Sequence, residues 1–376
     1  MNIEPACLLL TPSSWYNENV IRYKKQEMEM ANVYFLPIEK IDQFDKFLNE
    51  IKVFNIFKEN DIVGLKIHFG NSFHKNQVPP EYVKPIGNAL KNKGASIFLT
   101  DTNVLYRGER DDTFSHLEVV YKNNFDKLNI PVLIAGGFNG DYEFEIDTNG
   151  KYFKKLYFAK EYKEFSGMIA ITHFKGHSMA GIGGTIKNMG MGCASRKGKF
   201  AMHSNVTPAV NLSVCTGCGK CEKECLFGAI SIMDKKSYID SKKCKGCAWC
   251  VHVCPSGAIR IPWSSISHEM FQERLCEYAH GIIKFYKNKF FAINFLINIA
   301  EDCDCCKNPG KILSKDIGIC VSDDPVAVDK CSIDLLNKLN GHDVFLKIKP
   351  NLNYSHQFSY GEKIGLGSTK YNLVVF

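Results

Sequence analysis

The sequence lacks a hydrophobic run long enough to cross a membrane. Its longest apolar stretch covers residues 290–300 and is interrupted by Asn294 and Asn298, whereas a membrane-spanning helix needs about 20 consecutive apolar residues. The amino terminus has no basic segment, and its apolar run from Ala6 to Leu10 is too short for a signal peptide. We therefore expect a cytoplasmic protein that has no membrane partner.

Several functional signatures are also missing. Basic residues are not gathered into runs interleaved with aromatics, and the formal net charge is only +7, so we expect no nucleic-acid partner. The chain has no P-loop, no Rossmann fingerprint for flavin or nicotinamide, and no Ser-His-Asp order. These absences direct attention to a residue type that is abundant.

Cysteine is that residue, with 16 in the chain. In a reducing compartment, so many cysteines indicate metal ligation rather than disulfides. Half of them form two copies of C-x2-C-x2-C-x3-C, in CTGCGKCEKECLFGAI (215–230) and CKGCAWCVHVCPSGAI (244–259). Zinc sites use widely separated pairs instead. The spacing therefore predicts two 4Fe–4S clusters, with the last cysteine of each group ligating the other cluster.

This crossing rule assigns four ligands to each cluster. The first cluster takes Cys215, Cys218, Cys221 and Cys254, and the second takes Cys244, Cys247, Cys250 and Cys225. The module resembles bacterial-type two-cluster ferredoxins, although Leu226 replaces the expected proline after the first group. Lysines outnumber acidic residues between the two outermost cysteines. They either face an acidic redox partner or offset the charge of the clusters.

Alternating patterns of strands and helices lie on both sides of this module. Apolar runs bounded by glycine, aspartate or asparagine predict buried strands at 62–68, 96–100, 131–135, 168–172, 291–297, 317–321 and 371–376. Residues 80–93 and 325–339 fit helices. No linker rich in proline or serine separates the flanks. We expect an α/β fold, a mostly parallel sheet flanked by helices, built from residues 1–205 and 263–376, with an α+β two-cluster ferredoxin-like module inserted at 206–262.

Polar residues follow several of the predicted strands. Ligands of open parallel sheets bind outside the carboxyl ends of the strands, so we expect these residues to share one cleft. The candidates for catalysis are His68, His173 and Lys175, and those for cofactor or substrate binding are Lys66, Asp101, His177, Lys187, Asn188 and Asp324. Asp324 also fits the N-cap of the helix that begins at Pro325.

Two further stretches have more than one interpretation. Cys303 and Cys305, in DCDCC (302–306), could hold an additional metal ion of unknown identity with nearby imidazoles. They could equally be a redox pair or inert reduced thiols. The glycine-rich stretch 175–199 is either a loop that faces a substrate or a cluster, or a tight structural turn.

Six motifs together resemble one known family, the uncharacterised Fe–S centre proteins. They are LKIHFG (65–70), TDTNVLYRG (100–108), HFKGH (173–177), GGTIKNMGMGCASRKGK (183–199), CDC (303–305) and SDDPVAVDK (322–330). In that family a domain of unknown function carries an embedded ferredoxin module. The resemblance implies a redox protein of the anaerobic type and names no substrate.

We therefore expect an iron–sulfur redox protein, an oxidoreductase if it is an enzyme. Electrons would pass through two 4Fe–4S clusters to a metal or a small anionic substrate at the strand ends. One alternative is a non-catalytic electron-transfer or docking subunit of a larger redox complex. Another is a metallochaperone or cofactor-assembly protein. The partner would be a redox protein or a small molecule, and the oligomeric state is not predicted.

Overall fold

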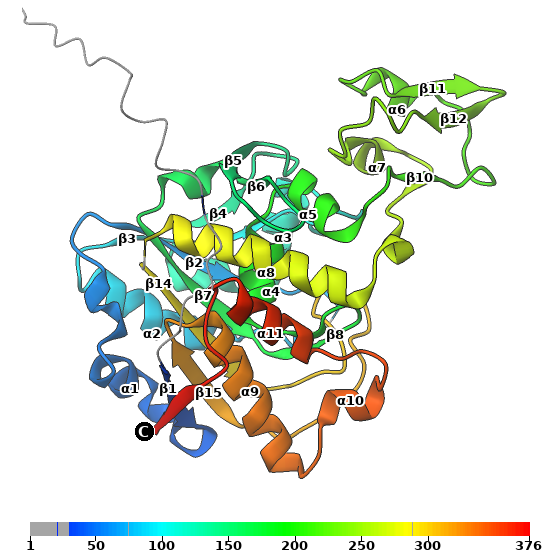
Figure 1. Cartoon of the computed structure of the whole chain (residues 1–376). Coiled ribbons are helices and arrows are strands. Elements are labelled where there is room, and N and C mark those ends of the chain that lie inside the picture. Colours follow the sequence, from blue (N-terminus) through cyan, green and yellow to red (C-terminus); the bar gives the residue numbers. More distant parts are fainter. Residues whose placement is uncertain (1–20, 22–29, 74, 288) are drawn as a thin grey trace, which may run out of the picture.

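The computed structural model describes residue 21 and residues 30–73, 75–287 and 289–376. The apolar run from Ala6 to Leu10 lies outside the described residues. An eight-stranded sheet with the order β16-β1-β15-β14-β7-β2-β3-β4 forms the centre of the molecule (Figure 1). Its strands are β1 (Ala31–Pro37), β2 (Ile62–Ile67), β3 (Ser96–Thr102), β4 (Val132–Ala135), β7 (Gly167–His173), β14 (Phe290–Leu296), β15 (Gly318–Ser322) and β16 (Tyr371–Val375).

The sheet is mostly parallel, as predicted. Every neighbouring pair of these strands is parallel except the two pairs that include β15, which runs antiparallel to both β1 and β14. The seven predicted strands are all present, with ends shifted by one or two residues. The sequence did not reveal β1, which lies between β15 and β16.

Helices cover both faces of the sheet. On one face lie α1 (Phe44–Glu50), α2 (Pro80–Lys91) and α3 (Thr113–Lys122), and on the other lie α4 (Thr185–Cys193), α8 (His268–Phe285), α9 (Pro325–Asn340) and α11 (Ser355–Lys363). The side chains of β7 alternate between the two layers: Ile169 and Ile171 pack with the first set, Met168 and Ala170 with the second. This is the doubly covered α/β sheet that the continuous apolar strands predicted.

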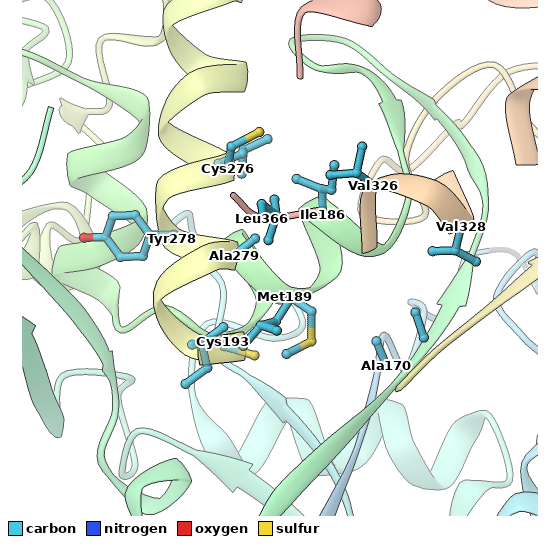
Figure 2. Packing of buried hydrophobic residues seen from close by; sticks show 14 of the residues in the cluster. Ala170, Ile186, Met189, Cys193, Cys276, Tyr278, Ala279, Val326, Val328 and Leu366 are labelled. Atoms are coloured by element: carbon cyan, nitrogen blue, oxygen red, sulfur yellow. The ribbon is translucent and has the colours of Figure 1, made fainter. Parts of the chain in front are cut away.

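The second layer is closely packed around α4 (Figure 2). Met189 and Cys193 of α4 lie against Ala279 of α8 and above Ala170 of the sheet. At Gly190 a side chain would place its Cβ 2.6 Å from the carbonyl oxygen of Leu275. The absence of a side chain there lets α4 and α8 cross in direct contact, which fixes α4 over the ends of β2 and β7.

A small module stands apart from the large sheet (Figure 1). It contains β10 (Ala209–Val210), α6 (Lys220–Lys223), β11 (Ile230–Met233), β12 (Lys236–Ile239), α7 (Trp249–Val253) and β13 (Ile259–Arg260). The strands pair as two small antiparallel sheets, β10 with β13 and β11 with β12. The limits 206–262 and the ferredoxin-like nature of this module stay predictions.

The remaining elements are short. They include the strand pairs β5 (Glu143–Asp147) with β6 (Lys155–Ala159) and β8 (Lys175–His177) with β9 (Gly181–Gly183), and the helices α5 (Arg196–His203) and α10 (Val344–Ile348). In the described part of the chain, no helix is long and apolar enough to cross a membrane.

Candidate functional site

A cavity of about 350 Å³ lies at the carboxyl ends of β2, β3 and β7. Its walls also come from α4, α5, the loop at residues 104–110 and the DCDCC loop. It holds most of the residues that the sequence singled out: Lys66, His68, Asp101, His173, Lys175, His177, Lys187, Asn188 and Cys305. Residues far apart in the sequence therefore meet at one edge of the sheet, as expected for strands that run parallel.

Asp324 does not join them, so its expected place in the cleft was wrong. Because β15 runs antiparallel to β14, its carboxyl end lies at the opposite edge of the sheet. There the Asp324 carboxylate accepts hydrogen bonds from the backbone N–H groups of Val326 and Ala327 at the start of α9, and from that of Ser368. Asp324 is a helix cap.

Three basic side chains surround the carboxylate of Asp101 in the cavity. Its oxygens lie 2.8 Å from Lys66 Nζ, 3.8 Å from Arg110 Nη1 and 3.8 Å from His116 Nε2. Burial alone would raise the pKa of Asp101, but Lys66 and the other cations hold that pKa well below its usual range. Lys66 also donates to Asn188 Oδ1 at 2.9 Å. Asp101 therefore remains ionised and neutralises part of a strongly positive site.

His173 and Lys175 were predicted to be catalytic, and the side chains of both contact other groups of the protein. The His173 ring faces the Asp304 carboxylate through Nδ1 at 2.9 Å and the carbonyl oxygen of Ile297 through Nε2 at 2.8 Å. Lys175 Nζ lies 3.2 Å from Asp304 and donates to the carbonyl oxygen of His173 at 2.7 Å. These contacts fix the buried Asp304, and with it the loop that presents Cys303 and Cys305.

His68 and His177, two further histidines of the cavity, are held as defined tautomers. Nδ1 of His68 accepts a hydrogen bond from the backbone N–H of Gly70 at 3.0 Å. Nδ1 of His177 accepts from the N–H groups of Met179 and Ala180. In the neutral form of each ring, the proton is consequently on Nε2.

The DCDCC loop places its cysteines next to the lysines of the cavity. Cys305 lines the cavity, and the buried Cys303 lies just behind it, with its Sγ 3.3 Å from Lys187 Nζ. Asn71 anchors this loop by donating to the carbonyl oxygens of Asp304 and Cys306. Among the residues that the structure describes, no three His, Cys, Asp or Glu side chains converge closely enough to hold one metal ion. A metal role for this pair stays a prediction.

The glycine-rich stretch is neither a loop nor a single turn but forms β8, β9, α4 and the start of α5, and several of its residues line the cavity. The first amides of α4, from Thr185 and Ile186, donate to the Asp329 carboxylate at 2.7 and 2.9 Å. Those amides are therefore already satisfied by the protein. Gly192 leaves room for the Lys66 side chain, because a Cβ at residue 192 would lie 2.6 Å from Lys66 Nζ.

Helix α5 supplies two cavity residues that the sequence did not single out as site residues. Lys199 and His203 are buried, lie four positions apart, and both line the cavity. His203 Nδ1 has no hydrogen-bond partner among the described residues, and its ring stacks on Phe271 with centroids 4.7 Å apart. The i, i+4 spacing was visible in the sequence, but the helix itself was not predicted there.

The same helix contacts the small module with its other side. Phe200 belongs to the hydrophobic cluster of the module and lies against Gly246, between Cys244 and Cys247. A second connection comes from the loop at residues 104–110, where Arg107 Nη1 donates to the carbonyl oxygen of Cys254 at 2.8 Å. Helix α5 and the loop at residues 104–110 therefore each contact both the cavity and the module that carries the cysteine groups.

The cysteines of the module line two separate hollows. One is lined by Cys215, Cys218, Cys221 and Cys254, and the other by Cys221, Cys225, Cys244, Cys247 and Cys250. Backbone N–H groups point at sulfurs in both, from Ser237 to Cys215 and from Ala229 to Cys225, each at 3.4 Å. Such hydrogen bonds to sulfur are typical of the surroundings of iron–sulfur clusters.

Comparisons with known proteins give a family but no activity. None of the curated proteins matches the sequence. Among solved structures, the chain is similar to the lactate racemase apoprotein from Thermoanaerobacterium thermosaccharolyticum, with 13% identity and a TM-score of 0.44. The match covers 82% of this chain and 57% of that one, so the chain spans little more than half the length of that protein.

The family model described as "Domain of unknown function (DUF362)" matches residues 63–334. That range includes the cysteine groups, the DCDCC loop and every predicted residue of the cavity. The chain belongs to the DUF362 family.

Proposed function

We propose that this protein is an iron–sulfur redox protein in which two 4Fe–4S clusters serve a small anionic substrate in the cavity at the strand ends. The observation that carries the proposal is the shared wall formed by α5. Phe200 packs beside cysteines of the module, while Lys199 and His203 of the same helix line the cavity. A binding site and a redox module are thereby held in fixed contact.

The cysteine hollows fit the proposed clusters. Each hollow is lined by the four cysteines that the crossing rule assigns to one cluster, and Cys221, which lines both, is a ligand of the first. When bound, the clusters would supply one-electron transfer. The chain's own contribution is to orient the thiolates, to donate N–H groups to sulfur, and to keep the module against α5.

The charge of the cavity supports an anionic substrate. Lys66, Arg110, Lys175, Lys187 and Lys199 all line it, whereas the carboxylates in contact with them are Asp101 and Asp304. An excess of buried positive charge is costly unless an anion enters. The volume of about 350 Å³ suits a small organic molecule.

A redox titration of two charge variants tests the link between the cavity and the clusters. Lys187→Gln removes a cation of the cavity, and Lys127→Gln removes an exposed cation on the opposite face of the sheet. Loss of positive charge near a cluster disfavours its reduction, so we expect a lower midpoint potential in Lys187→Gln and an unchanged one in Lys127→Gln. Equal potentials in all three proteins would contradict the proposal.

A docking subunit is the second candidate, because the module exposes apolar side chains and also carries several lysines. Leu226 is 93% exposed and Phe227 is 44% exposed, and Lys220, Lys223 and Lys245 belong to the same module. Such a surface fits an acidic electron-carrier protein. Reduction of the clusters by an acidic carrier should then slow with added salt and in Leu226→Asp. A rate that responds to neither change would exclude this role for the surface.

A further inference from the structure

Among the described residues, Lys199 differs from Lys66, Arg110 and Lys175 in having no carboxylate partner. Lys66 is paired with Asp101, Lys175 with Asp304, and Lys187 lies against Cys303. Within the described part of the chain, no carboxylate lies at ion-pair distance from Lys199 Nζ, although the side chain is only 5% exposed.

The hydrogen bonds of Lys199 fit a neutral amine. Its Nζ donates to Thr102 Oγ1 and to the carbonyl oxygen of Ala194. The hydroxyl of Thr102 donates in turn to the carbonyl oxygen of Gly192 at 2.8 Å, so it must accept from the lysine. A neutral amine has two N–H groups and one lone pair. Both N–H groups are taken, and the lone pair is left for the cavity that Lys199 lines.

The surroundings favour this form. Burial lowers the pKa of Lys199 to about 7, and the neighbouring Lys66 and Arg196 act in the same direction, while Asp101 and Cys193 oppose them. A lysine that is desolvated and placed beside another cation is an activated nucleophile toward carbonyl carbon.

We propose that Lys199 is a nucleophilic amine that forms an imine with a 2-oxo acid bound in the cavity. This inference rests on the proposed function, in which the cavity takes a small anion. With Lys199 neutral, four cations still face two carboxylates, so a carboxylate remains the favoured ligand. The amine adds to the ketone or aldehyde carbon, and loss of one water gives the carbon–nitrogen double bond, with no electron gained or lost.

Trapping by a hydride reagent tests this assignment on the intact, cluster-loaded protein. Glyoxylate and cyanoborohydride are added at pH 7 without oxygen, and modified lysines are mapped by peptide mass spectrometry. The hydride reduces the imine carbon and leaves a stable carboxymethyl-lysine. Exposed lysines such as Lys127 provide the internal comparison.

We expect Lys199 to be modified at least about tenfold faster than the exposed lysines. A pKa of about 7 gives roughly a thousandfold more neutral amine at pH 7 than the ordinary value of about 10.4. The rate at Lys199 should level off above pH 8, while the rates at exposed lysines keep rising. Lys199→Arg should abolish the adduct at this position alone.

Modification of Lys199 no faster than that of Lys127, or a rate that rises with pH in parallel with it, would overturn the inference. Iron and sulfide are measured on the same samples. Protein without clusters would overturn the proposed redox function whatever happens at Lys199, and loaded protein without the adduct would overturn only the amine.

Discussion

Replacement of Lys66 by methionine should be one of the most damaging single changes in the sheet. Lys66 is 1% exposed and its Nζ lies 2.8 Å from Asp101, which is 3% exposed. Methionine keeps most of the apolar length but leaves the buried Asp101 carboxylate with the backbone N–H of Thr102 and the more distant Arg110 and His116. Breaking a buried pair in this way costs about 3–5 kcal/mol.

The assay is anaerobic urea unfolding followed by far-ultraviolet circular dichroism. The double variant Lys66→Met/Asp101→Asn no longer has a buried carboxylate without its lysine. We therefore expect it to recover at least about half of the unfolding free energy that Lys66→Met loses. The control is Lys122→Met, which removes an exposed lysine 3.7 Å from Glu118. A change within about 0.5 kcal/mol is expected there.

The pH dependence of this effect has a definite sign. The pKa of Asp101 is lowered in the folded protein, so its contribution to stability is present above the unfolded value of about 3.9 and is lost as the pH falls through the folded value. The difference between wild type and Lys66→Met should therefore be largest near pH 7 and shrink in acid. A cost below about 1 kcal/mol at pH 7, or a double variant no more stable than the single one, would refute the reasoning.

Three further predictions concern other parts of the molecule. Gly190→Ala should lower the unfolding free energy by about 1–3 kcal/mol, since the new Cβ meets the Leu275 carbonyl oxygen, despite the better helix propensity of alanine; an unchanged melting temperature would contradict this. Burial raises the pKa of Asp324 to about 6, so wild type should gain up to about 3 kcal/mol between pH 7 and pH 4 that Asp324→Asn does not gain; parallel pH profiles would argue against it. Cys254→Ala should lose roughly half of the iron of a two-cluster protein. Cys276→Ala, which changes a buried cysteine of α8, should lose none, and equal iron in both variants would oppose the ligand assignment.

The sequence predicted most of the large sheet because its central strands are buried on both faces. Largely apolar runs such as those in β7 and β14 predicted the strand positions, and Asp324 before Pro325 marked the start of α9. The direction of β15 could not be predicted, since an apolar strand looks the same in either orientation. Because β15 is reversed, Asp324 lies at the edge of the sheet opposite to the cavity, where it was not expected.

The sequence predicted which residues meet in the cavity better than it predicted which groups those residues contact. Residues after parallel strands, such as His68 and Asp101, were found because topology alone brings them together. The engagement of His173 and Lys175 by Asp304 depends on where a distant loop docks, and no local pattern encodes that contact. Lys199 was not singled out from the sequence, because its lack of a carboxylate partner is a property of the folded site.

The most direct test of the central claim is the iron and acid-labile sulfide content of protein purified without oxygen, together with its EPR spectrum after reduction. The account predicts about eight irons and eight sulfides per chain and the signals of two reduced 4Fe–4S centres. The Cys303→Ala/Cys305→Ala variant should keep the same content, since neither residue is assigned to a cluster. Zinc in place of iron, or protein that is folded and free of sulfide, would contradict the account.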